Sequence, residues 1–300
     1  MVTIKNIEEI QENTSCSLAL GAFDGLHRGH MAVIEKALLP PFAEHAGVLT
    51  FAGSPSGGPA VITTEDKESL LAEQGIERLY SLCFSQVRDI PAEEFFWETL
   101  IGRCRAARLC CGEDFRFGKG AAGNVSLLTR LCREAEIELC VLADVLDHGE
   151  RISSTRIRAA VKAGEIPLAN RLLGRPFGFS AEVIHGNHIG TGLGFPTVNQ
   201  AIPEGFSIPP FGVYASRIQV ENTWYTGVTN IGVKPTVGSD RVLSETWIPE
   251  FSGDLYGKRL RLALLQFIRP ERKFDSLEEL KAEIRKNAAQ AGEITGAGKK

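Results

Sequence analysis

Residues 17–38 read SLALGAFDGLHRGHMAVIEKAL, and this stretch decides the fold of the first half of the chain. A short apolar run is followed by a glycine-bearing turn and then by a helical pattern. The helix is expected over residues 30–39, with Met31, Ile34 and Leu38 on one side, and two prolines end it. Because α/β sheets bind ligands at the carboxyl ends of their strands, this turn predicts a ligand site.

The same alternation of short apolar runs and helical patterns continues to about residue 175. Each run is apolar on both faces, as in a buried parallel strand, and helices between strands connect neighbouring parallel strands. The pattern therefore predicts an α/β domain with a parallel sheet. Strands are expected at 17–21, 47–51, 77–84, 107–112 and 138–144, and further helices at 64–74, 91–103, 124–136, 155–163 and 167–173.

The pattern of residues in the sequence changes from about residue 180. Runs such as SAEVIH, GVYASRIQV and VLSETWI are short, β-rich and separated by Gly, Pro or Asn, which predicts an antiparallel barrel or sandwich. A last helix is expected over 277–289. The sequence thus predicts domains at 1–178 and 179–290, with a disordered tail at 291–300.

Composition and charge narrow the class of protein. The chain has 300 residues and a net charge of −4. This charge argues against a polynucleotide partner and leaves room for a small local patch that binds the phosphates of a nucleotide. No signal-peptide pattern opens the chain, and no apolar run reaches the roughly 20 residues that span a bilayer. The seven cysteines lack C-x-x-C spacing, so we interpret them as reduced core thiols of a cytoplasmic protein without a structural metal site. The oligomeric state stays open.

The glycine-bearing turn has the features of a phosphate site. Backbone N–H groups and the start of a helix favour an anion, and Gly21, Gly25 and Gly29 permit close approach of the chain to it. His27 and His30 can both donate hydrogen bonds to a phosphate whose charge grows during attack. The alternative is a polar turn with two surface histidines; the ten-residue context favours the phosphate site.

This turn carries a family resemblance. GAFDGLHRGH (21–30) resembles the HxGH signature of the nucleotidylyltransferases and, more narrowly, the bacterial bifunctional riboflavin kinase/FAD synthetases. The resemblance implies a Rossmann-like nucleotidylyltransferase domain. It also implies an ATP site that contains Gly21, Phe23, Asp24, His27, Gly29 and His30, with the two histidines catalytic.

A second segment, ISSTRIRAAVKAG (152–164), resembles the second phosphate motif of the same superfamily. Ser153 or Ser154 can cap the helix that follows. Arg156 and Arg158 are two residues apart and do not share a helix face, so only one is expected to face phosphate. The resemblance favours Arg158, which with Ser154 and Thr155 would hold the β- and γ-phosphates of ATP. The alternative is a capped surface helix.

A third segment, CGEDFRFGKGAAGN (111–124), is similar to a stretch at the flavin site of the family. By this resemblance Phe115 and Phe117 stack on the isoalloxazine ring, and Asp114 holds the turn. A loop with two anchoring phenylalanines is the alternative.

The second half resembles a riboflavin kinase. GFPTVN (194–199) follows the glycine-rich stretch HGNHIGTGLG (185–194), in which Gly190 and Gly192 would cradle ATP phosphates. The resemblance makes Thr197 and Asn199 ligands of Mg²⁺ and of phosphate, in keeping with the preference of Mg²⁺ for oxygen. It makes Glu245 the general base for the riboflavin 5′-hydroxyl.

The chain also departs from the family pattern. Ile189 and Thr191 stand where basic residues are usual, and Trp247 replaces a usual histidine. Glu250 and Asn287 each stand where the family usually has Asp, and TFAGSPSGG (50–58) replaces a segment that usually reads TFxPHP.

The resemblance implies two reactions: riboflavin and ATP give FMN, then FMN and ATP give FAD and pyrophosphate. One alternative is an FAD synthetase with a degenerate kinase domain. Others are a nucleotidylyltransferase for a different phosphate acceptor and a non-catalytic flavin carrier.

Overall fold

The computed structural model describes residues 1–40, 44–53, 57–186, 194–236 and 239–296. The chain divides into two compact units. Unit 1 comprises Met1–Ala60 and Thr64–Ser154, and unit 2 comprises Val61–Thr63 and Thr155–Lys300. The domain boundary at residue 178 stays a prediction.

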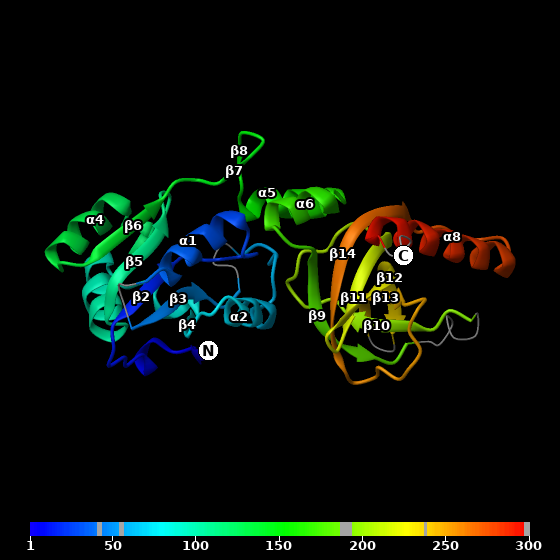
Figure 1. The fold of residues 1–300 in the computed structure, drawn as a ribbon, viewed down its shortest axis with the longest axis horizontal. Coiled ribbons are helices and arrows are strands. Elements are labelled where there is room, and N and C mark those ends of the chain that lie inside the picture. Colours follow the sequence, from blue (N-terminus) through cyan, green and yellow to red (C-terminus); the bar gives the residue numbers. More distant parts are fainter. Residues whose placement is uncertain (41–43, 54–56, 187–193, 237–238, 297–300) are drawn as a thin grey trace. The chain divides into compact units, whose positions relative to one another are not determined.

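Unit 1 is built on a six-stranded sheet in the order β1-β4-β3-β2-β5-β6, and every neighbouring pair is parallel. The predicted parallel α/β fold is confirmed (Figure 1). The three-residue β1 was not predicted; it pairs with β4 at the sheet edge. The strands are β1 (Val2–Ile4), β2 (Cys16–Leu20), β3 (His45–Phe51), β4 (Arg78–Leu82), β5 (Ala106–Gly112) and β6 (Glu138–Leu142).

Helices pack on this sheet through apolar faces. Helix α1 (Arg28–Leu38) buries Val33, Ile34 and Ala37. Helix α2 (Thr64–Glu73) differs, because it buries the charged residues Asp66 and Lys67 beside Leu71. α4 (Val125–Glu134) places Leu128 and Leu131 in the main hydrophobic cluster of unit 1. A short hairpin of β7 (Leu146–Asp147) and β8 (Glu150–Arg151) follows β6.

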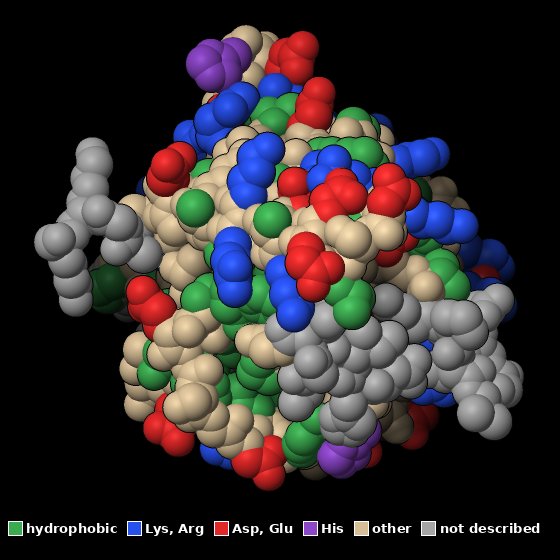
Figure 2. Space-filling model, turned by 90° about the vertical axis from the view of Figure 1, so that its right-hand side faces the viewer, with side chains coloured by type: hydrophobic (Ala, Val, Ile, Leu, Met, Phe, Trp, Pro, Cys, Tyr) green, Lys and Arg blue, Asp and Glu red, His purple; other side chains and the backbone are tan. Residues whose placement is uncertain are grey.

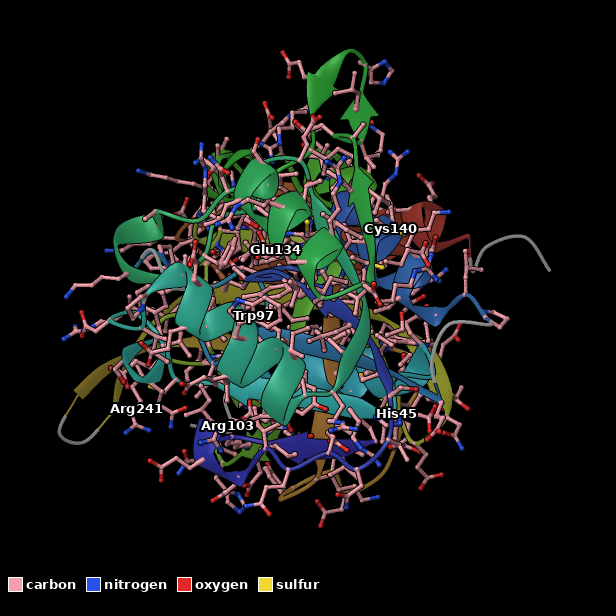
Figure 3. The ribbon with its side chains drawn as sticks, turned by 90° about the vertical axis from the view of Figure 1, so that its left-hand side faces the viewer. His45, Trp97, Arg103, Glu134, Cys140 and Arg241 are labelled. Carbon is pink, nitrogen blue, oxygen red and sulfur yellow. The ribbon has the colours of Figure 1, made fainter. Side chains whose placement is uncertain are left out.

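The helix predicted over 91–103 is not a continuous α-helix. A single α-turn, α3 (Ala92–Glu94), leads into a π-helical segment, Phe95–Arg103. The Cys104 N–H donates to the Thr99 carbonyl, a five-residue step that is typical of π geometry. The wider turn buries Phe95, Phe96 and Leu100 against the sheet and leaves Trp97 toward solvent (Figure 3).

Unit 2 contains α5 (Ser154–Ala163), whose first residue belongs to unit 1, α6 (Ile166–Leu173) and a closed antiparallel barrel. Closure excludes the predicted sandwich alternative and leaves no free sheet edge. Strand order around the barrel is β10-β13-β12-β11-β14-β9. The strands are β9 (Phe177–Ile184), β10 (Thr197–Ala201), β11 (Gly212–Val220), β12 (Thr223–Thr236), β13 (Ser239–Trp247) and β14 (Arg259–Pro270).

Helix α8 (Leu277–Thr295) lies on the outside of the barrel (Figure 1). Its Ala291 is fully buried against Val213, Ala215 and Val228. The prediction of a disordered tail beginning at 291 was wrong for residues 291–295, because this apolar contact continues the helix beyond residue 289.

The cysteines are reduced and mostly buried, as their spacing in the sequence predicted. All seven cysteines are free, and five are buried, while Cys83 is exposed and Cys140 is partly exposed. Acidic and basic side chains are interspersed on the face of the described residues in Figure 2. In the described part of the chain, no helix is long and apolar enough to cross a membrane. The cytoplasmic location and the absence of a nucleic-acid partner stay predictions.

Candidate active sites

The turn between β2 and α1 has an unusual backbone. Phe23 and Leu26 have φ values of 47° and 44°, and Gly25 has φ 88°. A left-handed conformation costs a non-glycine residue about 1–2 kcal/mol, so packing has to stabilise this turn. Phe23 and Leu26 are each 1% exposed. A Cβ on Gly21 would lie 2.9 Å from the Phe23 ring, so only glycine leaves room for that ring.

The two predicted histidines lie together at the end of this turn. The backbone N–H of His30 donates to Nδ1 of His27, 3.3 Å away, which makes His27 the N-cap of α1. An accepting Nδ1 carries no proton, so the proton of the His27 ring is on Nε2, where it can be donated. The two rings stack with centroids 3.5 Å apart, and the edge of Phe23 contacts the His30 ring. The pair can thus present hydrogen-bond donors side by side.

One residue of the second phosphate motif, Ser154, contacts this turn within unit 1. The Ser154 hydroxyl donates to the Asp24 carbonyl over 2.7 Å. Ser154 therefore begins α5 while its side chain holds the turn that precedes α1. Within α5, the Arg158 guanidinium donates to the Thr155 hydroxyl at 3.3 Å, so these two residues share a face. The preference for Arg158 over Arg156 stays a prediction.

The loop after β5 holds the predicted flavin residues. The Phe115 and Phe117 rings stack with centroids 5.7 Å apart. Phe117 is buried in the main hydrophobic cluster of unit 1, whereas Phe115 is half-buried at its edge. The Asp114 carboxylate pairs with Arg151 on β8, and Arg151 also pairs with Asp144 at 2.8 Å. Phe117 thus anchors the loop, and Phe115 is its outer ring.

On the barrel, strand register brings three polar residues into one row. Asn199 on β10 is opposite Glu245 on β13, and Glu245 is opposite Asn230 on β12. Directly opposed residues point to the same side of a sheet, with Cβ atoms about 5 Å apart. Val198, the neighbour of Asn199, belongs to the hydrophobic cluster made with Val183 and Ile218. Because side chains alternate, the polar row lies on the opposite side of the sheet from that cluster.

Asn199 is built into a tight site. Its side chain is 5% exposed, and its Nδ2 donates to the Thr197 carbonyl at 3.4 Å. Its Oδ1 is buried and accepts no hydrogen bond from the described residues. A Cβ on Gly186 would lie 2.6 Å from the Asn199 amide, so Gly186 makes room for it. The predicted phosphate-loop residues Gly190 and Gly192, with Ile189 and Thr191, lie outside the described residues.

Comparison with known proteins finds a match for each half of the chain. A family model described as FAD synthetase matches residues 9–156, and one described as riboflavin kinase matches residues 173–295. A protein of Escherichia coli K12 named bifunctional riboflavin kinase/FMN adenylyltransferase is 34% identical over 316 residues, 99% of this chain and 98% of its own. The chain belongs to the bifunctional riboflavin kinase/FMN adenylyltransferase family.

Further members of the bifunctional riboflavin kinase/FMN adenylyltransferase family have similar coverage. The protein of that name from Bacillus subtilis is 33% identical over 297 residues, 94% of this chain and 93% of its own. A solved structure from Streptococcus pneumoniae, described as a macrolide-efflux protein, superimposes with a TM-score of 0.84 at 30% identity. It covers 97% of this chain and 98% of its own, so both folds are shared with it.

The structure shows the surroundings of two residues in the riboflavin kinase half that depart from the family pattern, Trp247 and Asn287. Trp247 is opposite Thr197 in the strand register, and its ring packs nearly perpendicular to the Phe195 ring, with the ring centroids 4.8 Å apart. Asn287 is 2% exposed, accepts from Arg269 and donates to Glu283. A neutral amide can satisfy both charged neighbours at once, which explains how Asn is tolerated at this position.

Sequence reasoning missed two residues at these sites. Asn230 lies within the NIG motif, but only the register shows that it neighbours Glu245. Lys67 on α2 was assigned no role, yet it is 3% exposed and donates to the carbonyls of Ala22 and Phe51. No local signal marks Lys67, because a single lysine in a charged helix is usually solvated.

Proposed function

We propose that the chain makes FAD from riboflavin in two ATP-dependent steps, with the kinase step on the barrel and the adenylyl transfer at the turn between β2 and α1. The observation that carries the proposal is the match of both family models, one on each half of the chain. The row of Asn199, Glu245 and Asn230 and the stacked pair of His27 and His30 support it.

In the kinase step, Glu245 accepts the proton of the riboflavin 5′-hydroxyl as its oxygen attacks the γ-phosphorus of ATP and ADP leaves. Thr197 and Asn199 suit Mg²⁺, because the Asn199 Oδ1 is buried without a partner among the described residues. Bound there, Mg²⁺ would neutralise charge on the phosphates. Gly190 and Gly192 remain candidates for phosphate binding.

In the adenylyl-transfer step, a phosphate oxygen of FMN attacks the α-phosphorus of ATP, and pyrophosphate leaves. No covalent enzyme intermediate is needed, so the residues have to position the substrates and stabilise charge. His27 and His30 donate to oxygens on the α-phosphorus, while Ser154, Thr155 and Arg158 act on the β- and γ-phosphates.

The remaining ligand contacts come from two loops. Phe115 offers its face to the isoalloxazine ring, with Phe117 stacked beneath it and Asp114 holding the loop through Arg151. Gly21, Phe23, Asp24 and Gly29 shape the ATP side of the site.

The test is to incubate the purified protein with Mg²⁺ and ATP, and with either riboflavin or FMN, and to separate the flavins by chromatography. FAD from both substrates is expected. FAD from FMN alone would show that the kinase half is inactive, which Trp247 beside Thr197 gives reason to examine. Flavin binding without any product would overturn the proposal in favour of a flavin carrier.

A further inference from the structure

We propose that Lys67 is a positioning residue of the adenylyl-transfer site, which holds the turn before α1 in its reactive shape. This inference rests on the proposed function of unit 1. It assigns a role to a side chain on α2 that does not belong to either phosphate motif or to the flavin loop.

The turn before α1 begins where the pairing of β2 with β3 ends. β2 and β3 pair in register up to Leu20 and Leu49, and the Gly21 N–H still donates to the Leu49 carbonyl. One residue later the chain turns away, and the Ala22 carbonyl receives side-chain donors. The Thr50 hydroxyl donates to it at 2.7 Å and the Lys67 ammonium at 3.3 Å.

The Lys67 ammonium group connects two segments of the chain. Lys67 Nζ also donates to the Phe51 carbonyl at 3.0 Å. Lys67 therefore connects the end of β3 to the residue immediately before Phe23, where the positive-φ turn begins. Since Phe23 packs on His30 and His27 caps α1, a shift at Ala22 would move both histidine rings.

Lys67 also lies within the electrostatic reach of a buried carboxylate. Asp24 in the same turn is 5% exposed, and its charge acts on Lys67. Burial lowers the pKa of Lys67 to about 8, and Asp24 opposes that shift. Burying a charged lysine destabilises a protein unless hydrogen bonds and an opposite charge compensate. Here the buried ammonium group brings positive charge to a turn that is proposed to bind a triphosphate.

The test compares Lys67→Met with two other variants in steady-state assays of FMN to FAD and of riboflavin to FMN. Thr50→Val removes the second donor to the Ala22 carbonyl. Lys5→Met is the matched control, because Lys5 is exposed and pairs with Glu68 on the same helix. Urea unfolding of each variant shows whether unit 1 keeps its stability, and the kinase reaction, which is proposed to take place on the barrel of unit 2, shows that the second unit is active.

We expect Lys67→Met to lower kcat for FAD synthesis about 100-fold, because small displacements of reacting groups have effects of this size, with KM for FMN little changed. Thr50→Val should have a smaller effect in the same direction, and Lys5→Met none. Retention of kcat in Lys67→Met would overturn the inference. So would a loss of FAD synthesis in Lys67→Met that is accompanied by unfolding of unit 1 in urea, because that outcome indicates a purely structural role. Absence of FAD synthesis in the unmodified protein would instead remove the proposed function itself.

Discussion

His27 and His30 are joined by their backbone as well as by their rings. The Nδ1 of His27 accepts the His30 N–H, and the two imidazoles stack with centroids 3.5 Å apart. The His27 side chain thus caps the start of α1, and its ring stacks on that of His30. Because its Nδ1 accepts a hydrogen bond, the ring carries its proton on Nε2. Helix capping and the proposed phosphate chemistry can therefore be separated by substitution.

His27→Ala removes both roles and His27→Asn only one. Alanine cannot cap α1, so we expect a loss of about 1 kcal/mol in the free energy of unfolding together with loss of FAD synthesis. Asparagine is a good N-cap and should restore stability without restoring turnover. Urea unfolding and FAD assays of both variants make the comparison. Full activity in His27→Asn would contradict a direct role of the imidazole.

Glu245→Gln keeps the shape of the side chain and removes the proposed base. We expect FMN formation from riboflavin to fall by about 10²–10⁴, since general base catalysis contributes on this scale. FAD formation from FMN should not change. Glu250→Gln, which makes the same charge change at an exposed position, is the control. Comparable kinase rates in the two variants would exclude Glu245 as the base.

Gly186→Ala tests the tight site of Asn199. The added Cβ would lie 2.6 Å from the Asn199 amide, so that side chain must move and kinase turnover should fall at least about tenfold. Gly292→Ala in α8 is the control, because its Cβ would meet no atom within 4 Å. That substitution should stabilise the protein by up to about 1 kcal/mol. Unchanged kinase rates in Gly186→Ala would show that Asn199 is not needed where it lies.

The pKa of Lys67 predicts an alkaline limit on adenylyl transfer. Because burial lowers this pKa from 10.5 to about 8, Lys67 is charged below pH 8 and loses its proton above it. FAD synthesis should decline above pH 8 with a midpoint that the kinase reaction lacks. Rate profiles of the two reactions in one preparation provide the measurement, and an identical alkaline decline in both would contradict it.

The lowered pKa of Lys67 also makes the stability of the folded protein depend on pH. Between pH 8 and 10.5 the unfolded chain binds the Lys67 proton and the folded chain does not, so this group makes the free energy of unfolding rise with pH in that window. Lys67→Met should lack this rise. Urea unfolding at several pH values in the window, for both proteins, tests the sign.

The sequence predicted elements well where one local pattern decided them. The strand at 17–21 is found as Cys16–Leu20, and the helix at 30–39 as Arg28–Leu38, which starts earlier because the His27 cap was not recognised. The pattern over 91–103 was apolar enough for a helix, but periodicity alone does not separate α from π geometry. β10 was not predicted as a strand, since five residues carry little pattern of their own.

The two histidines, Asn199 and Glu245 were found from short motifs, and so was the order of the two folds along the chain. The order of the folds follows from hydrophobic alternation and turn residues, which act between neighbours in sequence. The four site residues follow from the family resemblance of their motifs, and their roles stay predictions. The tertiary structure decided the row of Asn199, Glu245 and Asn230, and it placed Lys67 on a carbonyl 45 residues away. Such contacts depend on strand register and on packing summed over a whole unit, and no local pattern encodes them.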